Sequence, residues 1–209
     1  MTERLDHRVI AAIVSEGAKV LDLGCGDGEL LELLRRQKDA QVRGVELNEQ
    51  SIYQCVSKGL SVVHSDLDSG LNGYPDHSFD FVILNQSLQQ VRNVELVLRE
   101  SLRVSSRVIV GFPNFAVWNA RAILALTGRT PVTDALPYGW YDTPNLRFLT
   151  LKDFKEFCTS KDFWILESHY LSARRKIHVW PNLFASVAVL VIGTWKDPSK
   201  VGKKGENIL

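Results

Sequence analysis

The stretch VLDLGCGDGELLELL, residues 20–34, constrains the fold of this chain more than any other part of it. A short apolar run ends at Gly24, two further glycines follow at alternate positions, and leucines then recur at helical spacing. This order predicts a strand, a tight glycine turn and a helix, which together form the first unit of an open α/β sheet. In such sheets the first strand-to-helix turn borders the crevice where ligands bind.

The alternation of strand and helix continues along the chain. The expected strands cover 18–24, 41–48, 60–66, 79–85, 106–114, 163–172 and 183–193, and the expected helices cover 5–14, 28–37, 49–59, 93–104, 117–128 and 151–161. Most of these strands are apolar on both faces, which is typical of strands with helices above and below them. We therefore predict an α/β fold, a doubly wound and mostly parallel sheet with helices on both faces.

Residues 114–150 interrupt this alternation after the fifth strand. They contain one helix and then a segment rich in proline, glycine and aromatic residues. A long irregular segment in a compact domain is functional or disordered, and the aromatic content argues for an ordered one. We expect a single domain over 1–195 with this helical and aromatic insertion, followed by a polar tail over 196–209.

Composition excludes several classes of protein. Lysine and arginine number 25 against 24 acidic residues, so no strong positive field favours nucleic acid as a partner. Cys25, Cys55 and Cys158 are scattered and the histidines lie singly, which fits a reducing compartment without a metal site. The longest apolar run is too short to cross a bilayer, and the charged N-terminus does not resemble a signal peptide. We expect a cytoplasmic protein.

The glycine spacing also limits the ligand. A dinucleotide-binding turn needs a glycine where this chain has Glu29, and a pyrophosphate would meet the negative charges of Asp27 and Glu29. A neutral or zwitterionic ligand that carries a ribose fits better. Glu46 ends the second strand, eighteen residues past Gly28, and a carboxylate at this place is positioned to accept hydrogen bonds from ribose hydroxyls.

Other polar residues on the strands are candidates with open alternatives. Asp66 follows the third strand, where Asp68 is a rival and a turn-forming aspartate is the alternative interpretation. Asp22 lies on an otherwise apolar strand, where an unpaired carboxylate is costly or becomes protonated, and an ammonium group, a water or the N–H groups of the loop could satisfy it. Tyr141 and Asp142, in the insertion, are the candidates for a general base.

The motifs VLDLGCGDG, GVELN, VVHSDLD, FDFVILNQSLQQV and VIVGFPN resemble, in this order, those of the class I S-adenosylmethionine-dependent methyltransferases, which have a Rossmann-like fold. This resemblance covers residues 18–113. The segments NQSLQQVRN, GFPNFAVWNARAILALTGRTPVTDALPYGWYDTPN and TLKDFKEF are similar to the MetW family of bacterial methionine biosynthesis, and they extend the resemblance to about residues 5–170.

The resemblance implies S-adenosylmethionine or S-adenosylhomocysteine as cofactor. The residues that it places around this cofactor are Asp22, Gly24, Cys25, Gly26, Gly28, Glu46, Leu47, Asp66, Leu67 and Asn85. Asp22 and the loop would surround the methionine part, Glu46 would hold the ribose, and Leu47, Asp66 and Leu67 would border the adenine. Asn85 would stand beside the sulfonium, with helix capping as the alternative.

The family further implies a bacterial, cytoplasmic protein that acts with a homoserine O-acyltransferase of the α/β-hydrolase type and supports its activity. It implies no methyl acceptor, and Gln90 stands where many methyltransferases of small molecules carry a histidine. Two hypotheses remain: a methyltransferase acting on a small molecule, or a binding protein whose insertion contacts the acyltransferase. We favour the second. The sequence leaves open the oligomeric state and the acyl donor of the partner.

Overall fold

The structure, a computed structural model, describes residues 4–172 and 175–194, so the expected polar tail lies outside the described residues. The strands are β1 (Lys19–Leu23), β2 (Gln41–Glu46), β3 (Val62–His64), β4 (Phe81–Asn85), β5 (Arg107–Pro113), β6 (Trp164–Ser172), β7 (Arg175–Lys176) and β8 (Val187–Gly193). The helices are α1 (Leu5–Ile13), α2 (Glu29–Lys38), α3 (Glu49–Ser57), α4 (Val94–Val104), α5 (Trp118–Thr127), α6 (Leu151–Ser160) and α7 (Pro181–Phe184), with short 3₁₀ helices η1 (Leu67–Ser69) and η2 (Leu88–Gln90).

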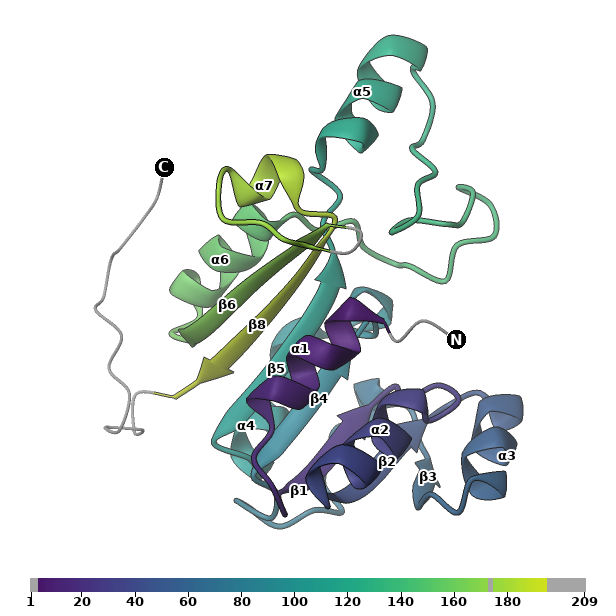
Figure 1. The fold of residues 1–209 in the computed structure, drawn as a ribbon, viewed down its shortest axis with the longest axis vertical. Helices are drawn as coiled ribbons and strands as arrows, with labels where there is room; N and C mark the ends of the chain where they lie inside the picture. The colour runs from purple at the N-terminus through teal and green to yellow at the C-terminus, as the bar shows by residue number, and fades with distance from the viewer. Residues whose placement is uncertain (1–3, 173–174, 195–209) are drawn as a thin grey trace.

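The strands form one eight-stranded sheet in the order β3-β2-β1-β4-β5-β8-β6-β7 (Figure 1). Neighbouring strands from β3 to β5 are parallel, whereas β8 runs antiparallel between β5 and β6. The strand order reverses between β1 and β4, and the glycine turn follows β1 at this point. The expected doubly wound, mostly parallel sheet is confirmed.

Three local expectations were wrong. The last strand begins at Val187 instead of residue 183, because residues 181–184 form α7 with a proline in its first turn. The connection between the last two expected strands, interpreted from the sequence as a loop, contains β7, which pairs with the end of β6. The third strand, expected over 60–66, covers only 62–64.

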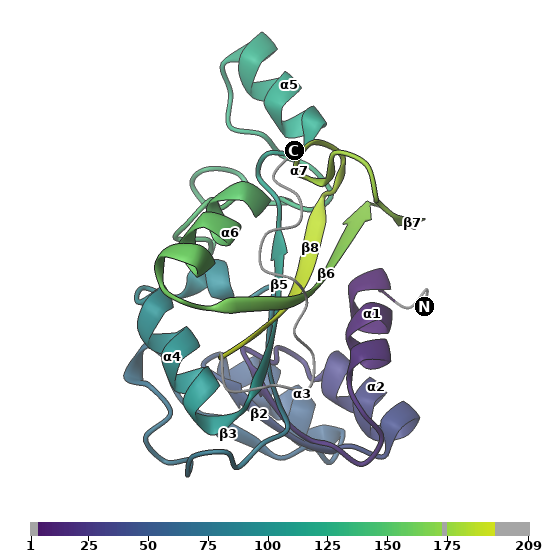
Figure 2. The same ribbon diagram turned by 90° about the vertical axis from the view of Figure 1, so that its left-hand side faces the viewer.

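Helices cover both faces of the sheet. Figure 2 shows α1 and α2 on one side of the strands and α4 and α6 on the other. Alternate residues of each central strand face opposite layers, so Ile83 packs with α1 and α2 while Val82 and Leu84 pack with α4 and α6. These two apolar layers fix the sheet, and the carboxyl ends of β1, β2 and β4 therefore meet at one edge.

The insertion projects from this same edge. α5 extends beyond the carboxyl end of β5, and an irregular loop returns from it to α6 (Figure 1). Of the ten residues of α5, only Ala120 is buried. We call residues 114–150 the arm. No helix in the described ranges is long and apolar enough to cross a membrane.

Candidate nucleoside-binding edge

The Glu46 carboxylate at the end of β2 is held by backbone donors. Its Oε2 accepts a hydrogen bond from the Gly26 N–H at 2.8 Å, and its Oε1 accepts from the N–H groups of Leu47 at 2.8 Å and Asn48 at 2.9 Å. A carboxylate offers about four acceptor positions, so about one remains for a ligand hydroxyl. The carboxylate is thus fixed in orientation at the place where a ribose is expected.

The three glycines of the turn have different reasons to be glycine. A Cβ on Gly24 would lie 2.6 Å from the Ser87 Cβ, and one on Gly28 would lie 2.5 Å from the Leu60 Cδ1, so both positions are closed by packing. Gly26, with φ of +54°, has nothing within 4 Å of a Cβ position. Gly26 is therefore the member of the turn that leaves open space for a ligand.

Asp22 is 2% exposed and belongs to β1. Its Oδ1 is buried and has no hydrogen-bond partner in the described chain. Burial, and secondly the negative charge of Glu46, raise the pKa of Asp22 to about 7. A buried carboxylate oxygen without a donor is costly, and a cationic group beside the turn would satisfy it. Burial also raises the pKa of the Cys25 thiol, which makes this residue a poor nucleophile.

Asn85 does not cap a helix, contrary to the alternative interpretation of its role. Its Nδ2 donates to the Asp6 Oδ2 at 3.1 Å, and its Oδ1 is buried without a partner in the described chain. Burial alone would raise the pKa of Asp6, but the hydrogen bond from Arg4 and its positive charge hold that pKa below the ordinary value. A charged aspartate of α1 therefore orients the Asn85 amide.

His7 adjoins this contact and is buried, and its Nδ1 lies 3.9 Å from the Glu29 carboxylate. Burial lowers the pKa of His7, so the ring is neutral at pH 7. Asp6 was absent from the sequence prediction, and His7 entered it only as one of the histidines that lie singly. Both lie three or four residues before apolar positions of the same helix, Val9 to Ala11, and this spacing was the available signal that they face the core.

The structure also distinguishes Asp66 from Asp68. Both Asp68 carboxylate oxygens accept hydrogen bonds from the backbone of Arg92, and Oδ1 also accepts from Asn93, so this side chain ties the loop to the start of α4. Asp66 forms the turn that its alternative interpretation predicted, since its Oδ1 accepts from the Asp68 N–H. Its carboxylate is exposed and keeps acceptor positions for a ligand.

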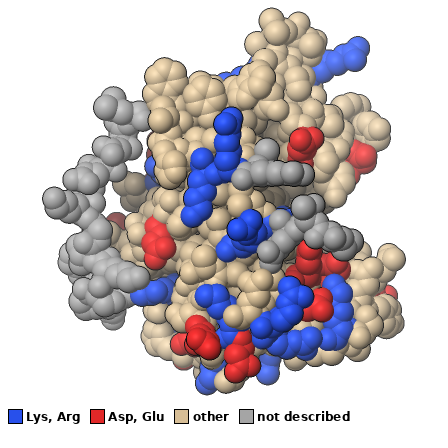
Figure 3. Space-filling view, viewed as in Figure 1, with Lys and Arg blue, Asp and Glu red and all other residues tan. Residues whose placement is uncertain are grey.

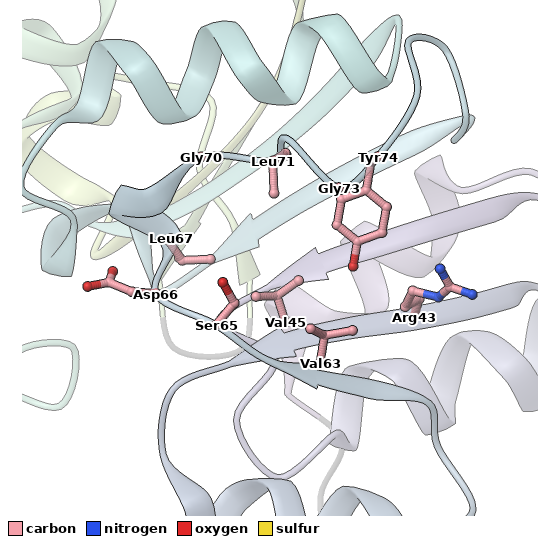
Figure 4. Close-up of a pocket in the computed structure, with 10 residues that line it drawn as sticks. All are labelled: Arg43, Val45, Val63, Ser65, Asp66, Leu67, Gly70, Leu71, Gly73 and Tyr74. Atoms are coloured by element: carbon pink, nitrogen blue, oxygen red, sulfur yellow. The ribbon is translucent and has the colours of Figure 1, made fainter.

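Asp66 and Leu67 stand at one end of a cavity of about 320 Å³, and Arg43 stands at the other (Figure 4). Valines of β2 and β3 form one wall, and the segment 70–74 forms the opposite wall. Leu47, 57% exposed, lies outside this lining. The three residues expected around the adenine are thus divided. Asp66 and Leu67 lie at one end of the cavity, whereas Leu47 is exposed outside it.

The candidate general bases make none of the contacts described above. Tyr141 is 78% exposed and its ring contacts Trp140, and Asp142 is also exposed. Among the described residues, neither side chain hydrogen-bonds to the turn 24–28, to Glu46 or to Asn85. The structure therefore gives no support for a catalytic role of this pair. No cluster of three or more His, Cys, Asp or Glu side chains suited to a metal occurs in residues 4–172 and 175–194.

A sheet of this order, with a glycine turn after its first strand and a carboxylate after its second, defines the Rossmann-like class I methyltransferase fold. Solved relatives have the same fold. A TehB-like S-adenosylmethionine-dependent methyltransferase from Corynebacterium glutamicum superposes with a TM-score of 0.62 at 19% identity, covering 92% of this chain and 90% of that one. An S-adenosylmethionine-dependent methyltransferase from Mesorhizobium loti gives 0.65 at 17% identity, covering 89% and 96%. The [4+2]-cyclase SpnF gives 0.62 at 16% identity, covering 90% and 80%.

Within this class, the chain belongs to the MetW family, because the family described as "Methionine biosynthesis protein MetW" matches residues 4–192. The bifunctional methionine biosynthesis protein MetXA/MetW of Rhodopirellula baltica is 34% identical over 203 residues, which are 91% of this chain and 33% of that protein. The 27-O-demethylrifamycin SV methyltransferase of Amycolatopsis mediterranei is 29% identical over 49% of this chain and 40% of the enzyme. The chain thus spans well under half the length of these curated relatives.

Proposed function

We propose that this chain binds S-adenosylmethionine or S-adenosylhomocysteine at the edge formed by β1, β2 and β4, and that it acts with and supports a homoserine O-acyltransferase. The observation that carries the cofactor half is the buried, unpartnered Asp22 Oδ1 beside a turn in which Gly26 alone leaves open space. The partner half is supported by the Rhodopirellula relative, which is named as a fusion of MetXA with MetW.

The residues at the edge fit the cofactor in chemical type. In this proposal the α-ammonium group meets the Asp22 carboxylate, the methionine part passes over Gly26, and a ribose hydroxyl donates to Glu46. Asp66 accepts from the adenine amino group, and Leu67 and Leu47 border the ring. Asn85, oriented by Asp6, stands at the end of β4 beside the sulfonium.

When bound, S-adenosylmethionine supplies an electrophilic methyl group on a sulfonium. The chain's own residues give a stronger argument for binding than for transfer. The segment from the last residue of β4 to the end of η2, residues 85–90, contains only amide, hydroxyl and apolar side chains, so none of its side chains can move a proton at neutral pH. The cyclase SpnF is named for a different reaction, which illustrates that this fold does not fix the chemistry. Methyl transfer to a small molecule is the alternative function.

The cofactor half is tested by titration calorimetry with S-adenosylmethionine, with S-adenosylhomocysteine and with NAD. We expect binding of one or both of the first two, and a preference for NAD would contradict the proposal. For the partner half, the acylation rate of the homoserine acyltransferase from the same organism is measured with and without this chain. We expect a complex and a higher rate. An unchanged rate without a complex would remove the partner half and leave the cofactor half intact.

The remaining expectations belong to the same proposal. The eight strands form one sheet, which supports a single domain with the arm as its insertion. A cytoplasmic location, the family's implication, stays a prediction. Incubation with S-adenosylmethionine that carries a labelled methyl group separates the two functions. The release of S-adenosylhomocysteine is measured with and without the acyltransferase and homoserine. Only a methyltransferase releases it at a rate that depends on an acceptor.

A further inference from the structure

The arm concentrates the exposed apolar surface of this protein. More than half of the exposed large apolar side chains in the described residues lie within residues 114–150. The six most exposed of them are Leu126, Tyr141, Trp140, Leu146, Trp118 and Val132. In Figure 3 the part of the surface formed by α5 and α7 is largely uncharged, whereas charged side chains gather over the opposite half of the molecule.

The amount of apolar surface on the arm is large for a single segment. Each of these side chains is about half exposed or more, and a large aromatic side chain offers roughly 150–250 Å², so the arm presents on the order of 1,000 Å² of apolar surface. A stable interface takes about 800 Å² from each partner, so the summed exposed apolar area of the arm is of the size that such an interface covers.

The helix of the arm also needs a partner for its own stability. α5 has ten residues, and only one of them is buried in this chain. Isolated helices shorter than about 12–15 residues are marginal in water. Leu126, 86% exposed, and Trp118 lie on this helix, so a surface that covers them would supply the packing that α5 lacks.

Hydrogen bonds connect the arm to the nucleoside edge. The Gln89 carbonyl, in η2 just after Asn85, accepts hydrogen bonds from the N–H groups of Leu146 at 3.0 Å and Arg147 at 3.2 Å. The Arg147 guanidinium donates to the carbonyls of Val91 and Arg92. A molecule seated on the arm is therefore connected, through a short series of backbone contacts, to the segment that borders the proposed sulfonium position.

We propose that the apolar surface of the arm is the docking site for the homoserine acyltransferase, an inference that rests on the proposed function. Its aromatic content and low charge match the composition of interface cores, in which tryptophan and tyrosine are enriched and charges are depleted. Two thirds of the Rhodopirellula fusion protein lies outside the part that matches this chain, so that relative carries a second large unit on the same polypeptide. The arm is the surface with enough apolar area to receive such a unit.

The test uses the full chain and two sets of exposed substitutions. Leu126→Gln with Trp140→Ala removes apolar surface at side chains that are 86% and 76% exposed. Tyr53→Ser, on α3, is the matched control, since Tyr53 is 73% exposed on an element outside the arm. The dissociation constant for the acyltransferase and the affinity for S-adenosylmethionine are measured by calorimetry, and the mass of the free chain is measured by sedimentation.

We expect the arm variant to weaken the complex at least about tenfold. The Tyr53→Ser variant should bind the acyltransferase as tightly as wild type does. Both variants should keep the wild-type affinity for S-adenosylmethionine. A wild-type complex that the arm variant forms equally well would overturn the docking site and leave the proposed function standing. No complex with wild type would overturn the partner half itself. A wild-type chain that dimerises alone, and becomes monomeric in the arm variant, would assign the surface to a second copy.

Discussion

Replacing Asp22 by asparagine tests two effects of its buried carboxylate. One is a lower free energy of unfolding for the ligand-free chain, and the other is a higher affinity for the cofactor. Burial raises the pKa of Asp22 from an ordinary value of 3.8 to about 7. One pKa unit corresponds to about 1.4 kcal/mol, so at pH 8 the charged carboxylate costs the ligand-free fold on the order of 4 kcal/mol. Between pH 4 and 7 the folded chain keeps a proton that the unfolded chain has lost, so the contribution of Asp22 to the unfolding free energy falls as pH rises.

Asp22→Asn keeps the shape of the side chain and removes the charge. We expect the ligand-free variant to be more stable than wild type by about 2–4 kcal/mol at pH 8, with the difference shrinking towards pH 5. Urea denaturation at pH 5, 6, 7 and 8 measures this. Asp39→Asn is the control, because Asp39 is exposed and sits in a left-handed conformation that asparagine tolerates.

The same substitution removes the proposed partner of the cofactor's ammonium group. A hydrogen bond between charged groups contributes about 1.5–3 kcal/mol, so S-adenosylmethionine affinity falls about ten- to a hundredfold at pH 8. Wild-type affinity rises as pH increases through about 7, because the deprotonated carboxylate is the acceptor, and the variant lacks this rise. If calorimetry finds equal affinities and the same pH dependence for both proteins, Asp22 does not face the ligand and our reasoning is refuted.

Four further substitutions test neighbouring parts of the structure. Glu46→Ala lowers S-adenosylmethionine affinity about ten- to a hundredfold, as read by calorimetry, and an unchanged value would exclude the ribose contact. Gly26→Ala abolishes binding at a stability cost of about 1–2 kcal/mol, whereas Gly28→Ala, whose Cβ meets Leu60, unfolds at clearly lower urea concentration. Asn114→Ala lowers the free energy of unfolding, measured by urea denaturation, by about 3 kcal/mol, since the buried Asn114 side chain makes four hydrogen bonds to the backbone.

The sequence predicted the local structure of this edge well where the signal was local. The strand, the turn and the helix around Gly24 to Gly28 follow from apolar spacing, and Glu46 follows from its place after the next strand. The individual reasons for the glycines were not predictable, because Gly24 packs on Ser87 and Gly28 packs on Leu60, both far along the chain. A contact of this kind appears only when the strands are brought side by side.

The same limit applies to the direction of strands and to hydrogen bonds between distant side chains. A buried antiparallel strand such as β8 carries an apolar run like that of a parallel one, so the sequence did not reveal its orientation. The hydrogen bond between Asn85 and Asp6 joins residues 79 positions apart, and neither residue type signals the other. The exposure of the arm's aromatic side chains was likewise not predictable, because the same sequence is compatible with aromatic side chains that pack against one another inside the insertion.

The two ends of the arm meet at one place. The Phe115 N–H donates to the Leu149 carbonyl, and the Asn114 Oδ1 accepts from the Leu151 N–H. A segment whose two ends meet at a single point beside the end of β5 imposes no spacing on the strands, so its length and composition can change during evolution while the strand order stays constant. Homologous proteins with this fold can therefore come to bind different protein partners while each keeps its small-molecule site.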